Sequence, residues 1–592
     1  LRVKRLLVTT ALEESWEDTQ PMLFLGEWCR LYSRRHRLSG LDAIVLPYHW
    51  NDSLKLQRDR QYLANLHEVL LVELGNELNE RHRSDHSPLY WRILLGPWLG
   101  FFTQTLFDRW ETVQSAIRTH DLSGTILLRG LSEARVPRDM TDYLHLGNGH
   151  QWNHHLFARI LEEFTDLSCV ARDFGDVGKT GSTEDVPSFP NRKQRLVAAY
   201  SSGAAALARS SEVFIINSCL RSLRDELALQ WRLGQVPRIN TAPSVKTQNP
   251  SRECRDWVLG VPSSDGFELC LRSLLPQQIP TAYLEGFSTL CAQAASLRWP
   301  SRPRVVFTSA SHFYDDLFKA WCAQRVEEGS RLVIGQHGGH VGIGWSFPHD
   351  HQVAVADRFI SWGWGSQGHP KVEPVGMLKA PVLPKRSEAE KELAVLVIGN
   401  ETPQIATISS AVLSSQYLEY LEDQYSFVDA LVGPVRSALT VRLPRDELDW
   451  EQADRWGDRI PSACLDDGRR PILELLAEAK LSIATNNGST FLESIFLDVP
   501  TVIYWDTSRW EILETARPFF DELSDVGVFH ETPQAAAEHI SNIWPDVDSW
   551  WQSEDVAVAV TRFSRQFCNR STDVLEDVKR CLIAEAAKSC AR

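Results

Sequence analysis

Residues 331–335, Arg-Leu-Val-Ile-Gly, run directly into residues 336–347, Gln-His-Gly-Gly-His-Val-Gly-Ile-Gly-Trp-Ser-Phe. The first segment is a short apolar run that predicts a buried strand. The second holds four glycines, which permit positive φ and close approach of the backbone to a ligand. His337 and His340 lie among them as side chains that exchange protons near neutral pH. A strand that ends in such a loop is typical of a ligand site at the carboxyl edge of a parallel sheet, and a tight turn is the alternative.

Similar apolar runs recur along the chain and alternate with segments of helical spacing. Further strands are predicted at 5–9, 43–47, 304–307, 358–362, 393–398, 439–443, 481–484 and 499–504. A helical pattern with leucines at intervals of three and four covers about 54–120. Strands that alternate with helices predict a parallel sheet with helices on both faces.

The predicted strands fall into two groups on either side of a charged link at 379–391. Since one hydrophobic core stops growing at roughly 250–300 residues, we expect an α/β protein with two Rossmann-like domains that face a cleft. The first domain should span 1–370 and carry a large helical elaboration at about 54–300. The second should span 380–555, and the last helices, at 556–592, should pack back on the first domain.

Composition excludes several classes of protein. The chain has 592 residues, a net charge of −15 and 43% hydrophobic residues, so it lacks the basic character of a nucleic-acid binder. Its eleven cysteines include no Cys-x-x-Cys pair, which fits reduced thiols and disfavours a zinc ribbon. No uninterrupted apolar stretch approaches the roughly 20 residues that cross a membrane. We expect a soluble cytoplasmic protein without a transmembrane segment, and peripheral association with a membrane is left open.

A second candidate site follows the predicted strand at 481–484. The turn Thr485-Asn-Asn-Gly-Ser-Thr490 leads into a helix, and the free N–H groups at the start of such a helix bind anions. We expect a phosphate site here, because a simple helix cap would not need the preceding Asn-Asn-Gly turn. The expected phosphate ligands are Asn487, Gly488, Ser489 and Thr490. Glu493 either binds a ribose hydroxyl or completes a capping box.

An unusually aromatic segment lies at 90–110, inside the predicted helical region. Tryptophan at this density usually belongs to a hydrophobic core, which is the favoured interpretation. Charged residues are interleaved with the aromatic ones, and they make a binding pocket the alternative. The residues assigned to that pocket are Trp91, Arg92, Trp98 and Arg109.

Seven segments, in order over nearly the whole chain, resemble one family of bacterial surface-carbohydrate transferases. They are 9–16, 25–28, 90–98, 107–110, 336–340, 357–364 and 489–493. The family is similar to glycosyltransferases of the GT-B fold, which hold a nucleotide sugar in the second of two Rossmann-like domains. It is distantly similar to capsule-type enzymes that transfer Kdo or nonulosonic acids from CMP donors.

This resemblance implies a glycosyltransferase with no cofactor beyond its nucleotide-sugar substrate, here expected to be a CMP-sugar. Asp-x-Asp-like pairs such as Asp466-Asp467 lack the strand-end context of a metal-dependent transferase, so we expect no required metal. The C-terminal domain would bind the donor and the N-terminal domain the acceptor, with the aromatic segment as the acceptor pocket. Arg442 would offset phosphate charge beside Ser489 and Thr490, and an exposed salt bridge is its alternative. The expected catalytic residues are His337, His340 and Asp350, with loop backbone from Gly338 and Gly339.

The sequence departs from the family pattern on both sides of Asp350-His351. His349 and Gln352 stand where the resemblance leads us to expect acidic residues, so Asp350 is the remaining carboxylate. We expect transfer of a sugar to a glycan or lipid-linked glycan acceptor in polysaccharide biosynthesis, for a capsule or lipopolysaccharide. Because of the departures, the alternative is a non-catalytic nucleotide-sugar-binding scaffold or a polyol-phosphate transferase of polysaccharide assembly.

Overall fold

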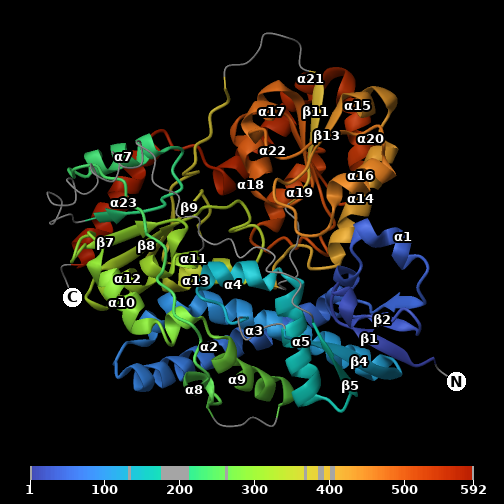
Figure 1. The fold of residues 1–592 in the computed structure, drawn as a ribbon. Coiled ribbons are helices and arrows are strands. Elements are labelled where there is room, and N and C mark those ends of the chain that lie inside the picture. The colour runs from blue at the N-terminus through green and yellow to red at the C-terminus, as the bar shows by residue number, and fades with distance from the viewer. Residues whose placement is uncertain are drawn as a thin grey trace, which may run out of the picture.

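A computed structural model describes residues 3–130, 135–174, 213–260, 265–365, 370–384, 392–399 and 407–589. Within these residues the strands form three parallel sheets that are covered by helices (Figure 1). Two sheets lie at opposite ends of the N-terminal part, and the third forms a C-terminal lobe. The predicted α/β class with parallel sheets is therefore confirmed.

The first sheet has the strand order β3-β2-β1-β4-β5. Its strands are β1 (Arg5–Val8), β2 (Met22–Phe24), β3 (Ala43–Val45), β4 (Leu122–Arg129) and β5 (Cys169–Asp173). Leu7 and Leu23 are fully buried, as expected for central strands of a parallel sheet with both faces covered.

The second sheet has the order β10-β9-β8-β7-β6 and contains the strand that precedes the glycine-rich segment. Its strands are β6 (Val213–Ile215), β7 (Val305–Thr308), β8 (Arg331–Gly335), β9 (Arg358–Ser361) and β10 (Val372–Pro374). The central strand β8 pairs with β7 and β9. The segment at 336–347, called the Gly/His loop below, therefore leaves the middle of the sheet at its carboxyl edge.

The third sheet has the order β13-β12-β11-β14-β15-β16. Its strands are β11 (Leu393–Val397), β12 (Leu439–Arg442), β13 (Cys464–Asp466), β14 (Ala479–Ala484), β15 (Thr501–Tyr504) and β16 (Phe529–His530). Counted along the chain this is the order 3-2-1-4-5-6 of a dinucleotide-binding Rossmann fold. The order reverses between β11 and β14, and ligands of such sheets bind outside the carboxyl ends of the strands at that point.

The N-terminal part differs from the prediction of one Rossmann-like domain with a helical insertion. β1 and β7, which were expected to share a domain core, lie in different sheets. The region at 54–300, expected to be helical, also contributes β4 and β5 to the first sheet and β6 to the second. These strands are separated by long stretches of helical periodicity, so the local sequence pattern does not predict them.

Two long helices join the N-terminal sheets. They are α2 (Ser53–His82) and α3 (Pro88–Thr119). The Asp52 carboxylate caps α2, and the Ser87 hydroxyl caps α3, which has a proline at its first position. In Figure 1 the two helices run across the molecule between the first and second sheets. The middle of α3 is buried on all sides, as in a helix that passes through a core.

The helix that follows the C-terminal lobe returns to the second sheet. α22 (Glu554–Phe567) packs against α18 (Ser489–Phe496) of the C-terminal lobe, whereas α23 (Val574–Ser589) packs on β7 and β8 (Figure 1). The buried Glu585 carboxylate on α23 accepts hydrogen bonds from Arg331 Nε at 2.6 Å and from Arg358 Nε at 3.1 Å. α23 thereby neutralises two arginines at the start of β8 and β9.

The remaining helices cover the sheets and their connections. The α-helices are α1 (Arg35–Leu38), α4 (Met140–Gly147), α5 (His150–Phe164), α7 (Leu223–Arg232), α8 (Arg252–Arg255), α9 (Gly266–Gln278), α10 (Phe287–Ser296), α11 (Ser311–Tyr314), α12 (Asp316–Glu327), α13 (Phe347–Val355), α14 (Gln416–Ala430), α15 (Gly433–Ala438), α16 (Gln452–Arg459), α17 (Ile472–Glu478), α19 (Arg517–Asp525), α20 (Pro533–Ile543) and α21 (Val547–Trp551). Short 3-10 helices lie at η1 (Glu13–Ser15), η2 (Glu27–Cys29), η3 (Tyr32–Arg34), η4 (His49–Asn51), η5 (Thr281–Tyr283) and η6 (Trp544–Asp546).

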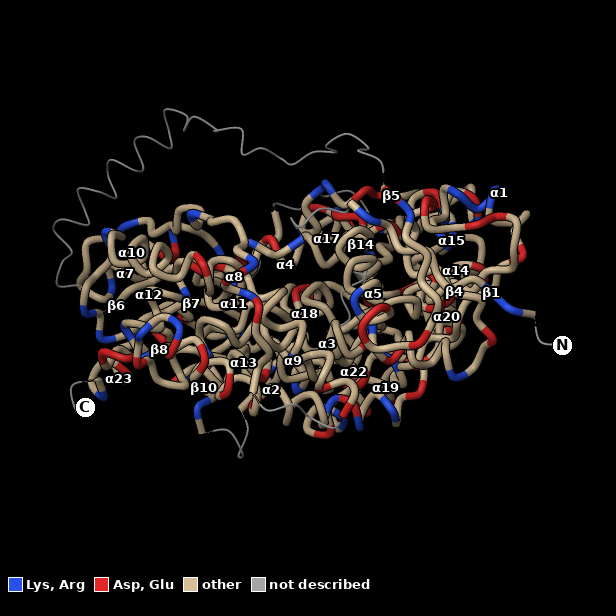
Figure 2. Tube along the Cα trace, turned by 60° about the horizontal axis from the view of Figure 1, so that its bottom comes forward, with Lys and Arg blue, Asp and Glu red and all other residues tan. Residues whose placement is uncertain are grey.

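Two surface properties bear on the site. Figure 2 shows acidic and basic residues intermixed along the described trace, so the net charge of −15 is spread over both halves of the molecule. Across the part of the chain that the structure describes, no helix has the length and apolarity needed to cross a bilayer.

Candidate active site

The Gly/His loop after β8 meets the start of α18, although the two are 150 residues apart in the chain. The backbone N–H of Gly339 donates to Ser489 Oγ at 3.0 Å. A Cβ on Gly339 would lie 2.7 Å from the carbonyl oxygen of Gly488, so a side chain there would force the two segments apart. α18 follows β14 beside the reversal of strand order, where ligands of such sheets bind. The two motifs found in the sequence therefore form one site between the lobes.

A matched pair of glycine substitutions tests this contact. Gly339→Ala places its methyl group against backbone, and we expect it to lower the free energy of unfolding by about 1–3 kcal/mol. At the neighbouring position a Cβ on Gly338 would meet nothing within 4 Å, so Gly338→Ala should change stability by less than about 0.5 kcal/mol. Urea unfolding of both variants measures the difference. Equal stability of the two would show that the lobes do not meet at Gly339 in solution.

The Gly/His loop is held from inside by Gln336, whose side chain is buried. Its amide nitrogen donates to the carbonyl of Gly338 at 2.8 Å. Its amide oxygen accepts from the backbone N–H of Trp362 at 3.0 Å and from Trp364 Nε1 at 2.8 Å. Because each of these polar groups would be costly to leave unpaired, Gln336 fixes the loop conformation before any ligand arrives.

His340 is hydrogen bonded to both lobes. Its Nε2 lies 3.1 Å from the carbonyl oxygen of Trp345, so this nitrogen carries the proton and donates it. The ring is also hydrogen bonded to the side chain of Asn487. Burial lowers the pKa of His340 more than these two hydrogen bonds raise it. The ring is therefore a neutral link between the Gly/His loop and the C-terminal lobe, which fits a positioning role.

His337 is the histidine of the loop that is open to solvent. Partial desolvation, and then the charge of Lys379, lower the pKa of His337 below its ordinary 6.5. The imidazole is therefore neutral at pH 7 and able to accept a proton. The adjacent Gly338 borders open space, which leaves room for a ligand beside the ring.

α13 places Asp350 and His349 on one wall of a cavity of about 1010 Å³ beside the loop. The cavity, called the cleft cavity below, is lined among others by Trp345, His349, Asp350, Trp364, Lys371 and Leu513. The exposed Asp350 carboxylate accepts from Trp345 Nε1. Burial, and then the charges of His340 and His337, hold the pKa of His349 well below its usual range. His351 and Gln352, on the other side of α13, are buried in the core.

The start of α18 is half-buried against the Gly/His loop and offers donors to an anionic ligand. Its cap residue Gly488 makes no side-chain capping bond, and the first N–H groups of a helix have no acceptors within the helix. The Asn486 side chain holds the preceding turn by accepting from the backbone N–H of Gly488 at 2.9 Å. Asn487 is buried and donates to the carbonyl of Ser410 at 2.9 Å, so it supports the turn rather than facing a ligand. Ser489 and Thr490 remain as hydroxyl donors at the helix end.

Lys379 is a site residue that the sequence analysis did not identify. Its ammonium group lies 3.2 Å from the Glu493 carboxylate, and its charge acts on His337. Lys379 was assigned to a charged link between domains, and only the folded chain brings it beside α18. The sequence predicts that Glu493 binds a ribose or completes a capping box. In the structure Glu493 also pairs with Lys379.

Arg442 lies at the carboxyl end of β12, as predicted, but its charge is already matched. Its guanidinium pairs with Asp466 on the neighbouring β13 and donates to the carbonyl of Gly468 at 2.7 Å. It therefore shapes the edge of the C-terminal sheet. Lys379 is also paired with a carboxylate, but its partner Glu493 is on α18, which puts this cation beside the helix.

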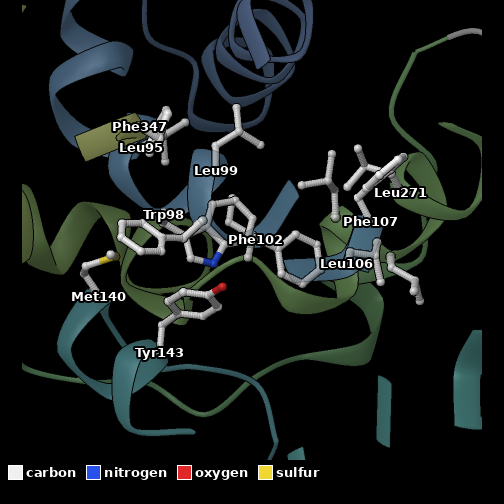
Figure 3. Packing of buried hydrophobic residues seen from close by; sticks show 14 of the residues in the cluster. Leu95, Trp98, Leu99, Phe102, Leu106, Phe107, Met140, Tyr143, Leu271 and Phe347 are labelled. Atoms are coloured by element: carbon white, nitrogen blue, oxygen red, sulfur yellow. The ribbon is translucent and has the colours of Figure 1, made fainter. Parts of the chain in front are cut away.

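The aromatic segment assigned to an acceptor pocket lies in the core instead. Trp91, Trp98 and Arg109 are at most 1% exposed. Figure 3 shows Trp98 packed among Phe102, Met140 and Tyr143. The Arg109 guanidinium pairs with Asp108 and donates to Asn153 at 2.9 Å, and Arg92 pairs with Glu68. These contacts favour the core interpretation, since a helix that is apolar all round is buried.

Comparisons with known proteins come from a family model and from solved structures. A model described as the LIC12162 family of transferases matches residues 5–582. Among solved structures, MurG of Acinetobacter baumannii is 10% identical over 63% of this chain and 99% of its own, with a TM-score of 0.32.

Two further solved structures show a similar level of likeness. The wall teichoic acid polymerase TagF is 9% identical over 68% of this chain and 97% of its own, with a TM-score of 0.33. The pneumococcal O-GlcNAc transferase GtfA, solved with UDP and GlcNAc, is 12% identical over 50% of this chain and 59% of its own, with a TM-score of 0.33. No curated protein matches.

Proposed function

The chain belongs to the LIC12162 family of transferases, and from this premise we propose that it transfers a sugar from a nucleotide-sugar donor to a glycan acceptor. The observation that carries the proposal is the contact of Gly339 with Ser489. It puts a proton-accepting loop and an anion-binding helix start at one place between two lobes. Glycosyl transfer needs both, a base for the acceptor hydroxyl and donors that stabilise the departing phosphate.

On the donor side, the phosphate is bound at the start of α18. The Ser489 and Thr490 hydroxyls and the free N–H groups of the helix donate to it, and the Lys379 ammonium offsets its charge. Gly488 adds no side chain of its own to the helix end. Asn487 supports the turn before α18 and does not contact the phosphate. Arg442 supports the edge of the C-terminal sheet.

On the acceptor side, the neutral His337 ring takes the proton of the attacking hydroxyl. His340 positions the Gly/His loop through its hydrogen bonds to Trp345 and Asn487, and Asp350 orients the acceptor through the carboxylate that faces the cleft cavity. Gly338 and Gly339 allow the loop backbone to approach the ligand and the opposite lobe. Since the cavity lies between lobes, bound substrates would be shielded from water, which limits hydrolysis of the donor.

The finer assignment rests on the family resemblance of the seven sequence segments. It supports a CMP-activated Kdo or nonulosonic acid as donor, transfer without a metal ion, and a product that belongs to a capsule or lipopolysaccharide. The scattered cysteines support synthesis on the cytoplasmic side, with the protein either free or bound peripherally to the membrane that carries a lipid-linked acceptor.

Thermal unfolding with a panel of nucleotides tests the donor assignment. A ligand that binds only the folded state raises its stability by RT ln(1 + [L]/Kd). We expect CMP to raise Tm, with the same shift in EDTA, and we expect the protein to release CMP from a CMP-sugar. A shift with UDP or GDP instead would change the donor but keep the reaction. Binding without release of nucleotide would favour the scaffold, and the absence of any shift would contradict the proposal.

A further inference from the structure

The cleft cavity is large enough for a substrate and is built from four separate parts of the chain, the fourth being Gln566. Its volume of about 1010 Å³ lies at the upper end of the range of ligand pockets, roughly 300–1,000 Å³. The Gly/His loop with α13 forms one wall, Trp364 and Lys371 form a second, and Leu513 of the C-terminal lobe contributes a third. The backbone N–H of Leu513 donates to the carbonyl of Ile343 at 2.8 Å, which joins two of these walls.

Trp345 presents a fixed indole to the cavity. Its backbone N–H donates to Ser410 Oγ at 2.9 Å, and its Nε1 donates to the Asp350 carboxylate. The Arg60 guanidinium lies 4.7 Å from the centre of its ring. The backbone, the ring nitrogen and one face of the ring are therefore all in contact with other groups. These contacts keep the indole in one orientation whether or not the cavity is filled.

Trp364 lies on another wall and is also fixed by its contacts, here with the Gly/His loop. Its Nε1 donates to the amide oxygen of Gln336 at 2.8 Å. The Gly/His loop makes room for the indole at Gly342, which has a φ of +86° and where a Cβ would lie 2.7 Å from the Trp364 ring. Any other residue at Gly342 would be strained and would collide with the indole. The loop is therefore shaped around a tryptophan that lines the cavity.

Polar groups stand between these aromatic walls. The Asp350 carboxylate is exposed at the cavity, and Lys371 donates to the carbonyl of Ala354 at 3.1 Å on its rim. His349 lines the cavity as well.

We propose that the cleft cavity binds a sugar ring of the acceptor, with the C–H face of the ring on the indole of Trp345 or Trp364 and its hydroxyls on Asp350 and His349. The proposal rests on the proposed function, because it assigns the acceptor of that transfer. A pyranose combines an apolar face, which packs on an aromatic ring, with hydroxyls that pair with a carboxylate. An alkyl chain would fill the apolar walls but bring no hydroxyl to the exposed carboxylate or to the imidazole.

Saturation-transfer NMR with methyl glycosides provides the test. The probes are the methyl glycosides of glucose, galactose, mannose, rhamnose, N-acetylglucosamine and Kdo, together with dodecyl maltoside, which carries both a sugar and an alkyl chain. We expect saturation of ring protons for at least one glycoside, and of the sugar rather than the chain in dodecyl maltoside. Trp345→Leu and Trp364→Leu should each weaken the binding at least tenfold.

Matched variants make the result decisive. Ala354→Trp fills the cavity from its exposed rim without removing a wall contact and should abolish binding. Trp231→Leu removes a tryptophan that is 74% exposed elsewhere and should leave binding unchanged. Ring protons saturated by none of the probes, or chain protons alone, would overturn the proposal. The nucleotide shift of the unmodified protein is measured separately, so failure of the acceptor assignment can be told from failure of the transferase assignment.

Discussion

Replacing His337 with alanine should lower kcat about 10²–10⁴-fold, the usual contribution of a positioned general base. The ring is open to solvent, borders free space at Gly338, and lies near the Lys379 charge beside α18. Nucleotide affinity should change little, because the ring is assigned to the acceptor proton and not to the phosphate. Steady-state kinetics with a CMP-sugar and a Tm shift with CMP measure the two quantities separately.

The pH profile gives an independent readout of the same residue. The base is active when neutral, and desolvation together with Lys379 lowers the pKa of His337 below 6.5. As pH falls through this lowered pKa, kcat/KM should decline, so the acid limb should lie below pH 6.5 and be missing from His337→Ala. An acid limb that survives in the variant would assign the base to another group. His349 is then the next candidate.

Two other histidines serve as controls for His337. His36 on α1 is exposed and has no role in the proposed site, so His36→Ala should leave kcat unchanged. His340→Ala should lose activity together with stability, because one hydrogen bond within the Gly/His loop and one to Asn487 of the C-terminal lobe disappear. A stable His340 variant with intact donor affinity and lost turnover would instead make His340 the base.

Replacing Lys379 with alanine should lower kcat/KM about 10²–10³-fold, the range found when one preorganised group that stabilises developing charge is removed. The loss has two physical sources. The departing phosphate loses its cation, and the Glu493 carboxylate, 3.2 Å from the ammonium in the intact protein, is left unpaired beside an anion. Lys379→Arg should recover part of the activity, since it keeps the charge.

The affinities of CMP and of cytidine distinguish the proposed role of Lys379 from a structural one. If the ammonium acts on phosphate, Lys379→Ala should weaken CMP binding and leave cytidine binding unchanged. Lys579 pairs with Glu576 on α23 at 3.0 Å and offers a matched ion pair away from the site, so Lys579→Ala should affect neither ligand. Equal losses for CMP and cytidine would mean that Lys379 supports the fold and not the phosphate.

Local features of the fold were predictable from the sequence because they depend on short-range patterns. The strand at 331–335 has the predicted bounds, and β11 and β12 end within a residue of their predicted ends. The turn into α18 was predicted because glycine and asparagine in a turn, followed by hydroxyl residues, have a direct conformational meaning. In each case the deciding information lies within about ten residues.

Features that depend on contacts between distant segments were not predictable in this way. Nothing in the sequence near Lys379 shows that it will meet Glu493, because that contact requires both lobes to be in place. Arg109 in the aromatic helix was read as a pocket residue, since its neighbour Asp108 and the distant Asn153 that hold it in the core are visible only after folding. Trp345 and Trp364 stood within quoted motifs, yet their common cavity was not evident.

The position of Glu585 has a consequence for how the protein is made. Arg331 and Arg358, which it neutralises, precede it by 254 and 227 residues. At translation rates of roughly 5–20 residues per second, a ribosome needs about 10–50 s to travel from β8 to α23. During that time the nascent chain carries the Gly/His loop on a sheet that still lacks α23. A message cut short before α23 would therefore encode both motifs of the site but leave Arg331 and Arg358 without the Glu585 carboxylate.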